Sequence, residues 1–112
     1  MDFLFEQRWT QTLNDLSDQF GQPVDLQAAL FLIGVQELGQ GYRTYKKDEK
    51  VQLIHVALCT LLQPFGYYEL VGRDEDGWPH FKRNGLLPSL IAEEQERLVK
   101  KAIVEYFSGL EE

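Results

Sequence analysis

The two most reactive side chains of the sequence, His55 and Cys59, stand four residues apart. On a helix this spacing places them on one face, with their Cβ atoms about 6 Å apart. An imidazole beside a thiol can lower the thiol pKa and activate it as a nucleophile, and the same pair can bind a metal ion. The alternative is a buried thiol beside a hydrogen-bonded histidine, which the many apolar residues around the pair favour.

A complete metal or catalytic site needs more partners than these two residues. The sequence contains two His and one Cys, so a closed zinc site would require carboxylates or a second subunit. His80, or an acidic residue near it, is the candidate third group. We therefore expect no bound metal and no cofactor. His55, Cys59 and His80 remain the alternative site, that of a small-ligand or metal-dependent enzyme.

The acidic run Asp74–Gly77 has the composition of a calcium-binding loop. An EF-hand loop requires glycine at its sixth position and carboxylates at its first and twelfth positions. With Gly77 at the sixth position, the first is Gly72 and the twelfth is Arg83, so both carboxylates are missing. The run is predicted instead to be the solvated turn of a hairpin, where Asp and Gly supply the turn geometry.

Aromatic and β-branched residues flank this turn between residues 67 and 83, which predicts a two-stranded β-hairpin. The favourable register places Glu69 opposite Lys82 and Leu70 opposite Phe81. A lone two-stranded sheet needs support from the rest of the protein. We therefore expect the face that carries Leu70 and Phe81 to dock on the helices.

The opposite face of this hairpin carries Val71, Trp78 and His80, which form the candidate interface. An exposed tryptophan is uncommon and often marks a protein-binding surface. The alternative is that the last helix or the stretch 86–88 folds over Trp78 and makes it part of the core.

Four helices are predicted to position these residues. The first three span about residues 2–20, 26–38 and 46–63, and the fourth carries the apolar positions from Leu98 to Leu110. Gly34 lies within the second helix, where it costs about 1 kcal/mol relative to alanine, so we expect a neighbouring helix to approach closely there. The predicted core consists of large apolar residues from the last three helices: Leu30, Ile33, Ile54, Leu58, Leu61, Ile103 and Phe107.

The predicted fold class is mainly α (α+β). Four helices are expected to pack as a compact bundle, with a two-stranded β-hairpin between helices three and four. A chain of 112 residues has room for a single globular domain spanning residues 1–112.

Charge and cysteine content exclude several functional classes. The sequence contains eleven Lys and Arg and eighteen Asp and Glu, which gives a net charge of -7. Neither nucleic acid nor an anionic membrane is therefore an expected partner. A single cysteine cannot form an internal disulfide. The longest apolar run, residues 28–35, is far shorter than the roughly 20 residues that span a bilayer. With no export signal in its first residues, the chain is predicted to be cytoplasmic.

Two segments, Phe31–Gly41 and Tyr67–His80, resemble a family of small uncharacterised bacterial proteins of the Bacteroidetes type. The resemblance covers most of the chain from residue 25 onward. It implies a bacterial cytoplasmic setting and supplies no activity or catalytic residues. Large apolar residues are plentiful and the sequence offers no comparable cluster of titratable residues. A non-enzymatic protein-interaction module, with a protein partner or as a homodimer, is therefore the expected function.

Overall fold

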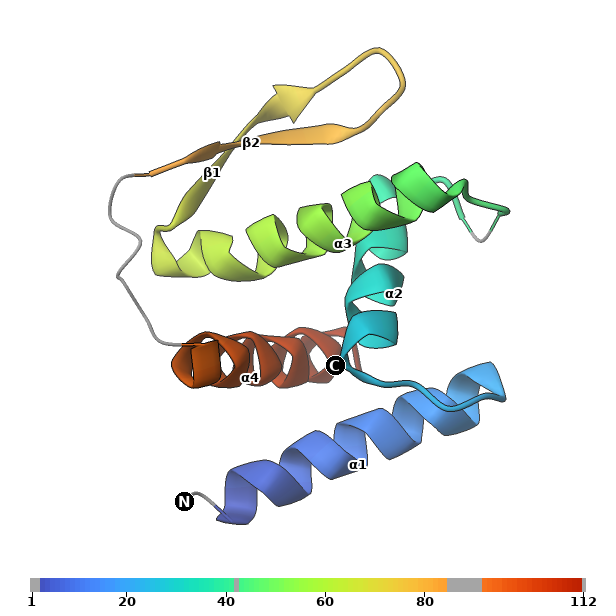
Figure 1. Ribbon diagram of the computed structural model, residues 1–112, viewed down its shortest axis with the longest axis vertical. Helices are drawn as coiled ribbons and strands as arrows, with labels where there is room; N and C mark the ends of the chain where they lie inside the picture. The colour runs from blue at the N-terminus through green and yellow to red at the C-terminus, as the bar shows by residue number, and fades with distance from the viewer. Residues whose placement is uncertain (1–2, 42, 85–91, 112) are drawn as a thin grey trace. The chain divides into compact units, whose positions relative to one another are not determined.

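The structure is a computed structural model, which describes residues 3–41, 43–84 and 92–111. A β-hairpin separates the third and fourth of four α-helices, as Figure 1 shows, so the predicted mainly α class is confirmed. The elements, in chain order, are α1 (Phe3–Phe20), α2 (Leu26–Leu38), α3 (Lys47–Leu62), the short 3-10 helix η1 (Gln63–Phe65), β1 (Tyr68–Arg73), β2 (Pro79–Arg83) and α4 (Ala92–Glu111).

The chain divides into two compact units. One comprises Met1–Ala29 and Leu90–Glu112, and the other comprises Leu30–Ser89. The boundary falls within α2, so the first turn of that helix belongs to one unit and the rest to the other. That all 112 residues form a single domain stays a prediction.

The first unit is built on the packing of α1 against α4. Both helices are amphipathic, and α1 buries Trp9 and Leu16 while α4 buries Ile103. The Lys100 ammonium lies 5.5 Å from the centre of the Trp9 ring. The aliphatic stem of a lysine in this position extends the apolar contact and its charge faces the aromatic ring.

The second unit depends on a close crossing of α2 and α3 at Gly34. A Cβ atom built on Gly34 would overlap the carbonyl oxygen of Leu53 and lie 2.7 Å from its carbonyl carbon. Atoms cannot approach this closely without a shift of the backbone, so only glycine fits at the crossing. The predicted close approach of a neighbouring helix at Gly34 is confirmed.

An apolar cluster forms where these two helices cross. We call it the Leu53 cluster, and its buried members are Val35, Leu38, Tyr45 and Leu53. Phe31 packs against it with its ring 5.9 Å from the Tyr45 ring in an edge-to-face arrangement. The Tyr45 hydroxyl donates a hydrogen bond to the Gly41 carbonyl, so the polar end of this buried ring is satisfied.

The buried face of α3 differs from the predicted one. Ile54 and Leu58, which were expected in the core, are half-buried, and Val51 is 64% exposed. The contact of Leu53 with Gly34 turns a neighbouring face of α3 inward. Buried positions on α3 are Leu53, Val56, Ala57, Cys59 and Leu61. Of the predicted core, Leu30, Ile33, Leu61 and Ile103 are buried, whereas Phe107 is half-buried.

The hairpin has the predicted register at its base, with Glu69 opposite Lys82 and Leu70 opposite Phe81. Beyond Leu70 the pairing shifts by one residue, so that Gly72 pairs with His80. Val71 has no opposite residue in β2 and forms a β-bulge. A bulge bends the strand and changes the direction of its side chains.

The expectation that the Leu70 and Phe81 face docks on the helices is wrong for Leu70. This side chain is 43% exposed, while Phe81 is half-buried and Pro79 is buried. The bulge next to Leu70 provides the physical reason, because β1 is bent at this point whereas β2 continues without interruption.

The crossing predicts opposite effects for two glycine substitutions. Gly34→Ala should lower the free energy of unfolding by about 1 to 3 kcal/mol or more, because the added methyl group meets the Leu53 backbone. Gly109→Ala is the matched control, since a Cβ there meets nothing within 4 Å, and it should stabilise α4 by up to about 1 kcal/mol. Urea denaturation measures both, and equal effects would contradict the proposed crossing.

Candidate functional site

His55 and Cys59 lie together on α3, as their spacing predicts. The Cys59 sulfur is 3.5 Å from Nε2 of His55. Their exposure differs sharply, because the His55 residue is exposed and Cys59 is fully buried. The thiol is therefore enclosed while the imidazole reaches the surface.

Burial raises the pKa of the Cys59 thiol from 9.0 to about 11. At neutral pH the sulfur is therefore protonated, and the thiol form is a poor nucleophile and a poor metal ligand. Among the described residues, no group of three or more His, Cys, Asp or Glu side chains is arranged to hold a metal ion. His80 lies in the hairpin, where its Nε2 is 2.9 Å from a carboxylate oxygen of Asp74.

The second candidate region is the turn of the hairpin, which Asp74 organises. One oxygen of its carboxylate, Oδ1, accepts hydrogen bonds from the backbone N–H groups of Asp76 and Trp78, each at 2.9 Å. The other, Oδ2, lies 2.9 Å from Nε2 of His80. Gly77 completes the turn with a φ of 87°, the left-handed conformation predicted for it.

These bonds also change the acidity of Asp74. The hydrogen bond with His80, and after it the backbone N–H groups of Trp78 and Asp76, hold the pKa of the Asp74 carboxyl below its ordinary value. Asp74 is therefore ionised at neutral pH, and it orients the imidazole of His80. The pair is exposed to solvent, with 63% of the His80 side chain accessible.

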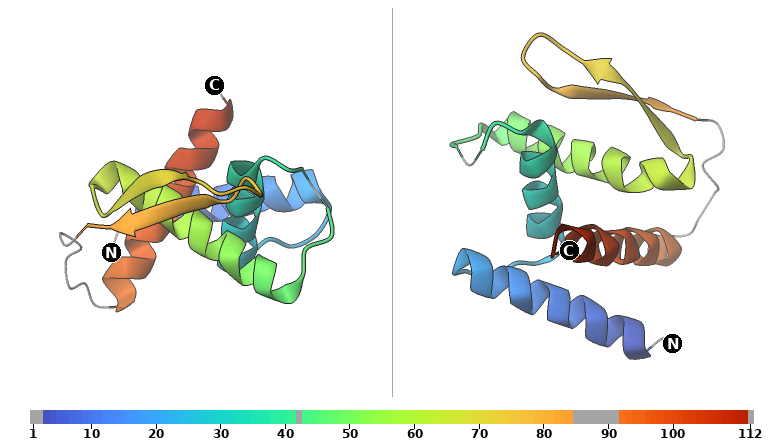
Figure 2. Two further views of the ribbon diagram at one scale, coloured as in Figure 1. Left: turned by 90° about the horizontal axis from the view of Figure 1, so that it is seen from above. Right: turned by 180° about the vertical axis from the view of Figure 1, so that it is seen from behind.

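Two polar side chains attach this turn to the end of α2. Arg73 donates to the Gly77 carbonyl at 2.9 Å and to the Glu37 carbonyl at 3.0 Å. Gln40 donates to the Asp76 carbonyl at 2.7 Å. The last turn of α2 carries no basic residue of its own, so Arg73 brings a positive charge to the negative end of the helix dipole. Figure 2, seen from above, shows the hairpin reaching this end of α2.

Trp78 packs against the Leu53 cluster and is half-buried. Of the two interpretations of Trp78, the core interpretation agrees with this packing. The cluster residues on which it packs come from α2, α3 and Tyr45. The stretch 86–88, which was expected to cover Trp78, lies outside the described residues. Trp78 thus serves to seat the hairpin turn.

The exposed apolar surface of the hairpin lies in its middle. Val71 is 69% exposed and Leu70 is 43% exposed. The edges of this two-stranded sheet are poor templates for a further strand, because the bulge at Val71 interrupts β1 and Pro79 in β2 has no N–H to donate. Of the candidate interface residues, Val71 and His80 are exposed and Trp78 is not.

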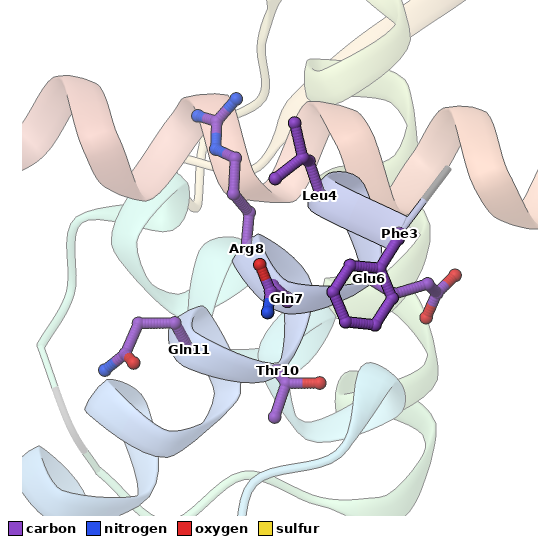
Figure 3. Close-up of a pocket in the computed structure, with 7 residues that line it drawn as sticks. All are labelled: Phe3, Leu4, Glu6, Gln7, Arg8, Thr10 and Gln11. Atoms are coloured by element: carbon purple, nitrogen blue, oxygen red, sulfur yellow. The ribbon is translucent and has the colours of Figure 1, made fainter. Parts of the chain in front are cut away.

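Figure 3 shows an open hollow on α1. It includes two exposed apolar side chains, Phe3 at 69% and Leu4 at 70% exposure. The lining residues that the structure describes all come from this one helix, so they do not by themselves enclose a ligand. They are Phe3, Leu4, Glu6, Gln7, Arg8, Thr10 and Gln11.

Comparison with known proteins adds no functional assignment, since no protein-family model, curated protein or solved structure matches the chain. The resemblance to the small bacterial family therefore stays a prediction. Within the described residues, no helix combines the length and apolar character needed to cross a membrane.

The Cys59 environment predicts slow alkylation. At pH 8 the native thiol should react at least about a hundredfold more slowly than a free thiol, because of its raised pKa and because reagents cannot reach it. Unfolding in urea should restore the reaction rate of a free thiol. A native rate above that of the free thiol, lost in His55→Ala, would contradict this account and support a Cys–His nucleophile.

Proposed function

We propose that the protein is a non-enzymatic interaction module that binds another protein through the middle of its β-hairpin. The observation that carries the proposal is the exposure of Val71 and Leu70 on a hairpin that is attached at both ends. Large apolar side chains on an ordered strand offer a partner buried area without the entropic cost of first ordering the chain. His80, oriented by Asp74, supplies a polar group on the same hairpin.

The interrupted edges of the two strands indicate how a partner would be recognised. A peptide that extends the sheet needs a continuous row of free backbone groups, which the bulge in β1 and Pro79 in β2 interrupt. Recognition would therefore use side chains, with Val71 and Leu70 at the centre of the contact and polar groups around them.

The alternative, a small-ligand or metal-dependent enzyme at His55 and Cys59, receives less support. Its nucleophile is fully buried, and its thiol pKa is raised to about 11. A catalytic cysteine requires the opposite environment, one that is accessible and favours the thiolate.

Matched charge insertions test the proposed interface. Val71→Glu places a carboxylate in the centre of the contact and should weaken association with the partner or with a second copy of the chain at least about tenfold. Val51→Glu is the control, because Val51 has nearly the same exposure, 64% against 69%, and lies on α3. Light scattering of the purified protein measures self-association, and quantitative co-purification from native cells measures partner binding.

Both variants should keep the melting temperature of the wild type, since both side chains are exposed. If both variants retain association, or if both lose it equally, the hairpin is not the interface. Loss in Val71→Glu alone supports the proposal.

A further inference from the structure

The bulge at Val71 divides the hairpin into two halves that are held in different ways. The base half contains residues 67–70 and 81–84, and the tip half contains residues 72–80. In the base half the strands pair in register and continue from η1 and α3. Asn84 closes this half, since its N–H donates to the Tyr67 carbonyl at 3.0 Å and its side-chain amide donates to the Gly66 carbonyl at 2.8 Å.

The tip half is organised internally by Asp74. Its carboxylate accepts the N–H groups of Asp76 and Trp78, and its backbone N–H donates to the Trp78 carbonyl at 3.0 Å. The Gly77 N–H donates to the Asp74 carbonyl, also at 3.0 Å. These bonds join residues within the turn itself, so they survive any movement of the turn as a whole.

Pro79 of the tip half is buried, and among the described residues three side chains attach this half to the end of α2 and to the Leu53 cluster. Arg73 bonds the Glu37 carbonyl, Gln40 bonds the Asp76 carbonyl, and the half-buried Trp78 rests on the Leu53 cluster. Both hydrogen bonds are exposed to solvent, and each connects residues 36 positions apart in the chain. Exposed bonds of this kind exchange readily with water and contribute little net free energy each.

In β1 the junction between the two halves is exposed, whereas β2 passes it without interruption. Val71 is 69% exposed, so its side chain has few contacts to lose. A Cβ atom on the adjacent Gly72 would meet nothing within 4 Å, so the space around the junction is open. The strand register already shifts at this position.

We propose that the tip half is a latch that opens as a unit about the bulge while the base half stays on α3. Release of Arg73 from the Glu37 carbonyl is the event that opens it. Opening lifts Trp78 away and uncovers the Leu53 cluster, whose members Leu53 and Val35 are 0% and 3% exposed in the closed state. The hairpin thus covers an apolar surface that becomes available only in the open state, and this conclusion does not depend on the partner proposed for Val71.

Nuclear Overhauser contacts of the Trp78 ring and amide hydrogen exchange of the full-length protein, both measured by NMR, test the latch without any partner. Arg73→Ala should weaken the contacts between the Trp78 ring and the methyl groups of the Leu53 cluster at least about twofold, because it removes a hydrogen bond between the tip half and α2. The Asn84 amide in the base half should be unaffected. Arg83→Ala is the matched control, an exposed arginine at the base end of the same hairpin.

Gln40→Ala provides a second variant that removes the other hydrogen bond, and it should weaken the Trp78 contacts in the same direction. Faster exchange of the Asn84 amide in Arg73→Ala would show that the hairpin opens as one unit, and unchanged Trp78 contacts in both variants would show that Arg73 and Gln40 do not hold the tip. Either result overturns the proposal. Should Arg73→Ala fail to fold, the Trp78 contacts and the Asn84 exchange of Gln40→Ala decide between these outcomes.

Discussion

The contact between Gly34 and the backbone of Leu53 is the constraint on which the second unit depends. It lets α2 and α3 cross with no side chain between them and turns Leu53 into the interior. The Leu53 cluster forms at this crossing and receives Trp78, which seats the hairpin turn. The same contact sets the rotation of α3 and hence buries Cys59 while His55 remains exposed.

The hairpin is attached at both ends and exposed in its middle. Its base continues from α3 and η1, and its tip is tied to α2 by Arg73 and Gln40. Val71 occupies the bulge between these attachments, so its side chain is left uncovered. The exposure of Val71 is therefore a consequence of where the hairpin is attached to the helices. The proposal of an interaction module follows from that exposure.

Local sequence patterns were sufficient to predict many elements of this structure. Gly34 in an otherwise apolar helix predicted the close crossing, and the pairing of Glu69 with Lys82 predicted the base register, because both depend on neighbours in the chain or on periodicity. The bulge at Val71 could not be predicted, since it depends on how β1 fits the helices. Arg73 was missed as a positioning residue for the same reason, because its acceptor on Glu37 is 36 residues away in the chain.

The most direct test of this account is the measurement of nuclear Overhauser contacts between the Trp78 ring and methyl groups of the second unit. Contacts from the Trp78 ring to methyl groups of Val35, Leu38 or Leu53 are expected, because the hairpin turn rests on the cluster formed at the helix crossing. Their presence in the wild type and their weakening in Gly34→Ala would support the dependence of the hairpin on this crossing. A Trp78 ring without contacts to these methyl groups would contradict it.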